Sequence, residues 1–126
     1  MATEQTVGKL SFELVSPERL LMSKLVDMVV MPGTEGMFGV LKGHAPLIAT
    51  LAPGVVDVYE AGQIVDKIFV AGGFAEVTGE RCVVLAETAL PIAQINRADA
   101  EAKLASSSTE EDRRLYRAMV EAAKAA

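Results

Sequence analysis

The chain has 126 residues, of which 51% are hydrophobic, and a formal net charge of −5. This length suits one domain, or one small domain with an appendage, and the hydrophobic content is too high for a disordered chain. The acidic balance argues against the basic stripe of a nucleic-acid-binding protein and against a polybasic membrane anchor, so we expect no nucleic acid partner.

Cys82 is the single cysteine, so the chain has no internal disulfide, which fits a reducing compartment. No apolar run approaches the roughly 20 residues of a membrane-spanning helix. Residues 1–10 lack the charged and apolar regions of a secretory signal peptide. We therefore expect a soluble, cytosolic protein without direct membrane insertion, which leaves docking onto a membrane complex open.

Residues 9–95 consist of short apolar runs separated by Gly, Pro, Asp and Glu. Leu10, Phe12 and Leu14 alternate with polar residues, which is the pattern of a half-buried strand. Turn signals such as Pro32-Gly33 and Gly72-Gly73 recur about every 8–12 residues, which indicates an antiparallel sandwich or barrel. Further strands are predicted over residues 25–31, 55–59, 64–71, 74–77 and 81–86.

The pattern changes near Asn96. Residues 96–126 carry 6 basic and 6 acidic residues, whereas residues 1–95 carry 6 basic and 11 acidic ones. Asn96, with Asp99 three positions later, has the form of a helix N-cap with an acidic first turn. The following residues up to Ala105 favour a helix by composition.

A second helix is predicted after the serines at positions 106–108. Ser108 and Glu111 have the spacing of a capping box. Leu115, Met119 and Ala122 then recur at helical spacing. The sequence therefore divides into a β-rich domain over residues 1–95 and a C-terminal helical hairpin over residues 96–126.

The apolar face of this hairpin is narrow and mostly alanine. Alanine buries little surface, and isolated helices of this length are marginal in water. Two interpretations stay open. The hairpin is a weakly docked moving part, or it simply packs against the rest of the chain and frays at its end.

His44, the one histidine, lies in a predicted loop, Gly43-His44-Ala45-Pro46. No base-orienting partner is evident nearby, so a contact or structural role is favoured, and a small enzyme centred on His44 is a rival hypothesis. One His and one Cys form no zinc set, so we expect no catalytic residue, metal or cofactor.

The glycines at positions 33, 36 and 39 have a spacing that invites comparison with a phosphate-binding loop. Such a loop needs a helix directly after it, so that a helix N-terminus meets the anion. Here the apolar pair Val40-Leu41 follows instead. Tight turns between short strands explain these glycines better.

Arg113, Arg114 and Arg117 place three guanidinium groups on the second predicted helix. Residues 113 and 117 share a face, and residue 114 lies near them. Arginine suits bidentate pairing with carboxylates on a partner. A solvated helix surface is the alternative.

The segment from Pro32 to Pro46, PGTEGMFGVLKGHAP, followed by Leu51-Ala52-Pro53-Gly54, resembles the epsilon-subunit family of F-type ATP synthases, whose mitochondrial members are called delta. Three further segments occur in the order of that family: Val15-Ser16-Pro17-Glu18, residues 70–77 and residues 83–89. The resemblance covers the chain from Leu10 to Arg97.

This resemblance implies a mainly β fold with an α tail. In the family, a flattened antiparallel β-sandwich of about ten strands precedes a C-terminal α-helical hairpin. The sandwich binds the gamma subunit and rests on the c-ring, so that a non-catalytic rotor subunit couples proton flow to ATP synthesis. In bacteria the hairpin can extend along gamma and restrain ATP hydrolysis. The expected location is peripheral, on the cytoplasmic face of the inner membrane.

Carried over by position, the c-ring contact comprises Glu35, Gly36, Met37 and His44. The family often has an acidic residue where this chain has Met37, so an ionic contact is lost there. If the hairpin inserts into the catalytic head, the three arginines, Arg113, Arg114 and Arg117, contact acidic groups of the catalytic beta subunit.

Some bacterial members bind ATP through the motif Ile/Leu-Asp-x-x-Arg-Ala. Arg97 and Ala98 match the end of this motif, but Gln94 stands at the carboxylate position and Ala93 precedes it. We therefore expect a vestigial nucleotide site with weak or no ATP binding. A general β-sandwich interaction module with an unrelated partner is the alternative function.

Overall fold

The computed structural model describes residues 8–125. The absence of a signal peptide was argued partly from residues 1–7, which lie outside the described residues. The described chain contains eight strands, one 3₁₀ turn and two helices. Their bounds are β1 Leu10–Val15, β2 Leu20–Val26, β3 Met28–Gly33, β4 Gly36–Leu41, β5 Leu47–Leu51, β6 Gly54–Glu60, β7 Gln63–Val77, β8 Arg81–Pro91, η1 Ile92–Gln94, α2 Arg97–Ala105 and α3 Glu110–Lys124.

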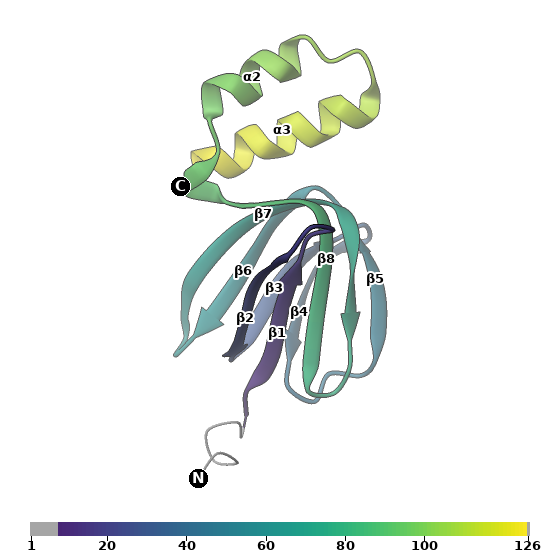
Figure 1. Cartoon of the computed structure of the whole chain (residues 1–126), viewed down its shortest axis with the longest axis vertical. Helices are drawn as coiled ribbons and strands as arrows, with labels where there is room; N and C mark the ends of the chain where they lie inside the picture. Colours follow the sequence, from purple (N-terminus) through teal and green to yellow (C-terminus); the bar gives the residue numbers. More distant parts are fainter. Residues whose placement is uncertain (1–7, 126) are drawn as a thin grey trace.

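The long strand β7 joins the two layers of the sandwich. Its first part pairs with β6 as far as Val70, and its last part pairs with β5 from Gly73 onward. β8 pairs with both parts, from Ile68 to Val77. One layer therefore contains β2, β1, β8, the end of β7 and β5, while the other contains the start of β7, β6, β3 and β4. Figure 1 shows these strands curving around a common interior.

The core lies between the layers and is built from alternate residues of each strand. On β1 the buried residues are Leu10, Phe12 and Leu14, as their alternation predicted. Because successive strand residues point to opposite faces, the intervening residues face outward. The core is mostly aliphatic, and its members are Leu10, Phe12, Leu14, Val26, Val29, Met31, Val40, Leu51, Val56, Val58, Ile68, Val70, Ala75, Val77, Cys82, Val84 and Ala86.

The mainly β fold class with a helical tail is confirmed, but the described chain contains eight strands rather than about ten. The sequence placed a turn at Gly72-Gly73, whereas β7 continues through both glycines. Gly72 has φ +69°, which changes the strand direction without ending the pairing with β8. A glycine pair that lets a strand bend has the same sequence signature as a turn.

One further strand prediction missed its bounds, and two strands were not predicted. The strand predicted over residues 25–31 spans the end of β2 and the start of β3, which Asp27 alone separates. The Asp27 N–H donates to the Tyr59 carbonyl at 3.0 Å, so the kink is fixed by a long-range bond that sequence does not reveal. β4 and β5 were not predicted as strands because each has an exposed apolar residue, Met37 and Ile48, that breaks the expected alternation.

The helical hairpin follows the sandwich. The Asn96 side chain accepts from the Asp99 N–H at 2.9 Å, which confirms the predicted cap of α2. The predicted capping box at Ser108 was wrong by one residue, because Thr109 caps α3 by accepting from the Asp112 N–H at 3.0 Å. Within residues 8–125, no helix has the length and hydrophobicity to cross a membrane.

Candidate functional site

The outer face of the first layer carries a row of apolar side chains, here called the outer band: Leu20, Val15, Leu85 and Phe74. Each pairs with the next across neighbouring strands, from β2 through β1 and β8 to β7. Cross-strand partners point to the same face of a sheet. Leu20 is 55% exposed and Phe74 is 42% exposed, so the helices leave the band open.

Charged side chains border the outer band on its next row. Glu13 pairs with Val83, which pairs in turn with Glu76, and Ile48 continues the row on β5. Arg81 donates a hydrogen bond to Glu13, and this bond raises the pKa of Arg81. Ile48 is 69% exposed. The face is an apolar strip with a charged border, which is the usual composition of a protein–protein contact.

A groove of about 450 Å³, here called the β4–β5 groove, lies beside this face. Glu35, Gly36 and Met37 line it from the β3–β4 turn and β4. Leu47 and Ile48 line it from β5, and sequence reasoning missed both of them. The sequence signal that could have identified Leu47 and Ile48 is that they form an apolar pair directly after Pro46.

His44 does not share this groove. It follows the far end of β4, where its N–H donates to the Leu41 carbonyl at 3.1 Å. Its Nδ1 lies 2.7 Å from the Ala45 carbonyl, and Gly43 donates to Gly79 in the β7–β8 turn. The four residues expected at the c-ring therefore divide into two groups at opposite ends of β4.

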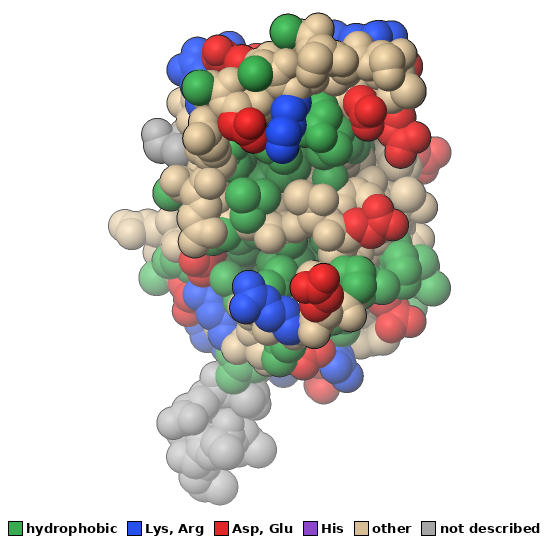
Figure 2. All heavy atoms as spheres, turned by 45° about the horizontal axis from the view of Figure 1, so that its top comes forward, with side chains coloured by type: hydrophobic (Ala, Val, Ile, Leu, Met, Phe, Trp, Pro, Cys, Tyr) green, Lys and Arg blue, Asp and Glu red, His purple; other side chains and the backbone are tan. Residues whose placement is uncertain are grey.

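The helical hairpin covers part of the second layer, and its contact is here called the hairpin seam. Phe69 is fully buried beneath α3, and Ala71, Ile92 and Ala122 are buried with it. Leu115 and Met119 are partly buried against this cluster. Figure 2 shows hydrophobic side chains in the hollow under the helices, with acidic and basic side chains around it. α3 contributes two large side chains, Leu115 and Met119, and two alanines, Ala118 and Ala122, so alanine limits its share of the burial.

The ion pairs between described residues do not join the hairpin to the sandwich. Those of the hairpin are Arg97–Glu101, Lys103–Asp99, Arg113–Glu110 and Lys124–Glu121, all within one helix. Apolar packing therefore carries the seam, and exposed pairs three or four residues apart add little to helix stability.

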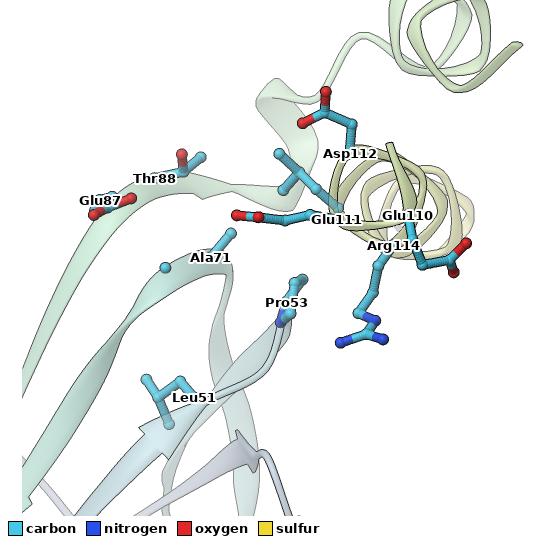
Figure 3. A pocket seen from close by; sticks show the side chains of 11 residues that line it. Leu51, Pro53, Ala71, Glu87, Thr88, Glu110, Glu111, Asp112 and Arg114 are labelled. Carbon is cyan, nitrogen blue, oxygen red and sulfur yellow. The ribbon is translucent and has the colours of Figure 1, made fainter. Parts of the chain in front are cut away.

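A cleft of about 480 Å³ lies between the first turn of α3 and the strands. Its charged lining residues are Glu87, Glu110, Glu111, Asp112 and Arg114. Figure 3 shows Glu111 and Arg114 extending from α3 toward the strands, whereas Glu110 points away from them. Four carboxylates and one guanidinium give the cleft a negative balance, which disfavours an anionic ligand.

The three arginines of α3 have different surroundings. Arg113 is paired with Glu110 and donates to the Ser107 carbonyl at 3.4 Å. Arg114 lines the cleft, and Arg117 is exposed. Because Arg113 is held within its own helix, Arg114 and Arg117 are the two better placed to contact a partner.

The residues of the vestigial nucleotide motif do not gather with these arginines. Arg97 donates to Glu101 at 2.9 Å on the exposed side of α2, and Ala98 is also exposed. Gln94 lines a different hollow with Leu14 and Met22. Among the described residues, no cluster of His, Cys, Asp and Glu could hold a metal ion.

The sequence of the chain is similar to those of known proteins. The family profile described as ATP synthase, Delta/Epsilon chain, beta-sandwich domain, matches residues 9–92. The chain is 52% identical over 114 residues to the ATP synthase epsilon chain of Rhodospirillum rubrum, covering 90% of this chain and 82% of the relative. It is 52% identical over 99 residues to that of Granulibacter bethesdensis, covering 79% and 73%.

Two solved structures have a similar fold. A chain of the Euglena gracilis mitochondrial ATP synthase, in a structure of OSCP, F1 and the c-ring, matches with TM-score 0.68 and 27% identity, covering 90% of this chain and 76% of that one. A chain of the Tetrahymena thermophila mitochondrial ATP synthase central stalk and c-ring matches with TM-score 0.70 over 91% and 96%, and at 14% identity it supports the fold alone.

Proposed function

The chain belongs to the ATP synthase delta/epsilon family, and from that premise we propose that it is a non-catalytic subunit of the central stalk that binds the gamma subunit and the c-ring. In this role it turns with the rotor and couples proton flow to ATP synthesis. The proposed location is peripheral, on the cytoplasmic face of the bacterial inner membrane. The proposed division is a sandwich domain over residues 1–95 and a hairpin over residues 96–126.

The outer band is the observation that carries this proposal. Its four apolar residues lie side by side on the layer that the hairpin leaves open. An exposed apolar strip with a charged border fits a protein partner better than a small substrate. Gamma, the stalk partner that the family implies, is the proposed occupant.

A mixing experiment with purified gamma tests this assignment. Phe74→Glu should weaken gamma binding by about tenfold or more, because the one aromatic contact of the outer band would be replaced by a charge. Val65→Glu is the matched control, since Val65 lies on the β6–β7 hairpin and is 46% exposed against 42% for Phe74. If both variants bind gamma as the unaltered chain does, the band is not the contact. If no form binds, a general interaction module with another partner becomes the better account.

The β4–β5 groove is the proposed c-ring contact, with Glu35, Gly36 and Met37 on one side and Ile48 on the other. His44 forms a second, separate contact at the far end of β4. Met37→Glu should make c-ring binding more sensitive to salt, because an added charge is screened by ions. His44→Ala should weaken binding independently. Binding that neither change affects would exclude both contacts.

The hairpin is proposed to restrain ATP hydrolysis when it leaves the sandwich. Its seam lacks an ion pair to the strands among the described residues, so undocking must offset only the burial of the apolar cluster around Phe69. Arg114 and Arg117 are the proposed contacts to the catalytic beta subunit, with Arg113 released from Glu110 as a third. Deletion of residues 97–126 should raise hydrolysis by the assembled complex. An unchanged rate would assign the hairpin a structural role.

ATP binding by this chain is proposed to be weak or absent. Gln94 replaces the motif carboxylate, Arg97 is paired with Glu101, and the cleft at α3 has a negative balance. Isothermal titration calorimetry with Mg-ATP should give no saturable heat. Binding in the micromolar range would contradict this proposal.

A further inference from the structure

Met37 occupies an unusual position, at the junction of two hollows. It lines the β4–β5 groove, and it also lines a second hollow of about 370 Å³ shared with Ala118, Ala122 and Ala125 at the end of α3. Its side chain is 59% exposed. The apolar thioether of Met37 is therefore exposed to solvent where the two hollows meet.

The other described methionines are less exposed to solvent than Met37. Met31, on the neighbouring strand, is fully buried in the core. Met22, Met28 and Met119 are half-buried, and Met119 packs in the hairpin seam. Because oxidation of methionine follows exposure, Met37 is the described methionine that a dissolved oxidant reaches most readily.

We infer that Met37 is a site of reversible oxidation by hydroperoxides, and that its oxidation weakens docking at the β4–β5 groove. The sulfur takes one oxygen atom from the peroxide, whose O–O bond breaks. The sulfur loses two electrons and becomes a sulfoxide, while hydrogen peroxide is reduced to water. Methionine sulfoxide reductases reverse the change with two electrons from a dithiol, which becomes a disulfide while the oxygen leaves as water.

The effect on docking follows from polarity and rests on the proposed c-ring contact. Met37 shares the groove with Leu47 and Ile48, so a partner seated there covers an apolar wall. A sulfoxide oxygen is a strong hydrogen-bond acceptor, and neither Leu47 nor Ile48 carries a donor. The side-chain donors in the groove lining are the hydroxyls of Thr34 and Thr50. Covering the sulfoxide oxygen without a donor costs binding free energy. Oxidation therefore changes an apolar contact with Leu47 and Ile48 into a polar one.

The first arm of the test uses the isolated protein. It is treated with hydrogen peroxide, and oxygen incorporation at each methionine is followed by peptide mass spectrometry. Met37 should oxidise about tenfold faster than Met31, since susceptibility follows exposure. Similar rates at Met37 and Met31 would overturn the inference, whatever the function of the protein. Treatment with both reductase types should then restore the original mass.

The second arm measures c-ring binding before and after peroxide, with the peroxide removed before mixing. Each protein is compared with its own untreated sample, so differences in basal affinity cancel. Unaltered chain and the Met119→Leu variant should both lose about tenfold in affinity, whereas Met37→Leu should show no loss on treatment. Equal losses of affinity in all three proteins would overturn the inference that oxidation of Met37 weakens docking.

The two arms separate this inference from the proposed function. If untreated protein does not bind the c-ring, the proposed contact fails, and with it the effect of oxidation on docking. Selective oxidation of Met37 in the first arm would still support the modification site.

Discussion

At Gly73, strands β7 and β8 approach so closely that a side chain has no room. A Cβ built there would lie 1.8 Å from the Leu85 carbonyl oxygen and 2.8 Å from the Ala86 Cα. Both atoms belong to backbone, so neither can move aside cheaply. The sequence identified this glycine pair as special but assigned it to a turn, because glycine in a turn and glycine at a close approach look alike in one sequence.

Gly73→Ala should therefore destabilise the protein by about 3 kcal/mol or more, because the strands must separate to admit a methyl group. Gly79→Ala is the matched control, since a Cβ there meets nothing within 4 Å. That control should change stability by less than about 0.5 kcal/mol. Urea denaturation measures both, and equal effects would contradict the close approach.

The reactivity of Cys82 is also set by the surroundings of a single residue. Its side chain is fully buried in the core, and burial raises the pKa of its thiol to about 12. Because the thiolate is the reactive form, iodoacetamide at mildly alkaline pH should modify the native protein far more slowly than the urea-unfolded protein. Matching rates in the two states would show that the core opens at β8.

Asp27 gives the fold a pH dependence. It accepts from Lys9 at 2.5 Å and from the Ala61 N–H at 2.6 Å, and the bond with Lys9 is the main cause that lowers the pKa of Asp27 below its ordinary 3.8. A lowered pKa stabilises the fold above the ordinary value, and this contribution is lost as the pH falls through the lowered one. Unaltered chain should be more stable than Asp27→Asn at neutral pH, and the difference should shrink in acid. A difference independent of pH would assign the effect to packing.

At the scale of elements, sequence periodicity succeeded where one face of a strand is buried. β1 alternates cleanly because it lies in the middle of its layer. The strand predicted over residues 81–86 matches only the alternating first part of β8, which extends to Pro91. Periodicity failed at β4 and β5, whose exposed apolar residues mark a surface rather than the core. The same residues line the β4–β5 groove, so the failure of the pattern and the candidate site have one cause.

Two adjacent residues compete for the N-cap position at the start of α3. Ser108 and Thr109 are both suitable caps, and the structure uses Thr109. Thr109→Ala should cost about 1 kcal/mol of local stability, because the Asp112 N–H loses its acceptor. Ser108→Ala should be nearly neutral. Hydrogen exchange of the α3 amides compares the two variants, and a larger effect at Ser108 would restore the original prediction.

At the scale of the whole molecule, a β-sandwich carries a helical hairpin that packs on it through apolar side chains. The sandwich has two opposed faces. The helices lie at one end of the sandwich in Figure 1, where α3 packs on Phe69 and Ala71, and the outer band lies on the first layer. The family and the fold class followed from sequence because the motif between Pro32 and Pro46 is specific. The outer band could not be predicted from the sequence, because it depends on pairings between strands far apart in the chain.

The attachment of the hairpin should be visible as uneven stability. Amides of α2 and α3 should exchange faster than those of β7 and β8, because helices of this length are marginal by themselves and apolar packing alone holds the seam. Uniform protection across helices and strands would contradict a lightly docked hairpin and would favour the simple packed tail.

Proton-driven ATP synthesis by reconstituted complexes tests the central claim most directly. Vesicles assembled without this chain should synthesise little ATP under a proton gradient. Adding the unaltered chain or Val65→Glu should restore synthesis, whereas Phe74→Glu should fail to do so at the same concentration. Synthesis that is independent of the chain, or is restored equally by Phe74→Glu, would contradict a rotor subunit that binds gamma through the outer band.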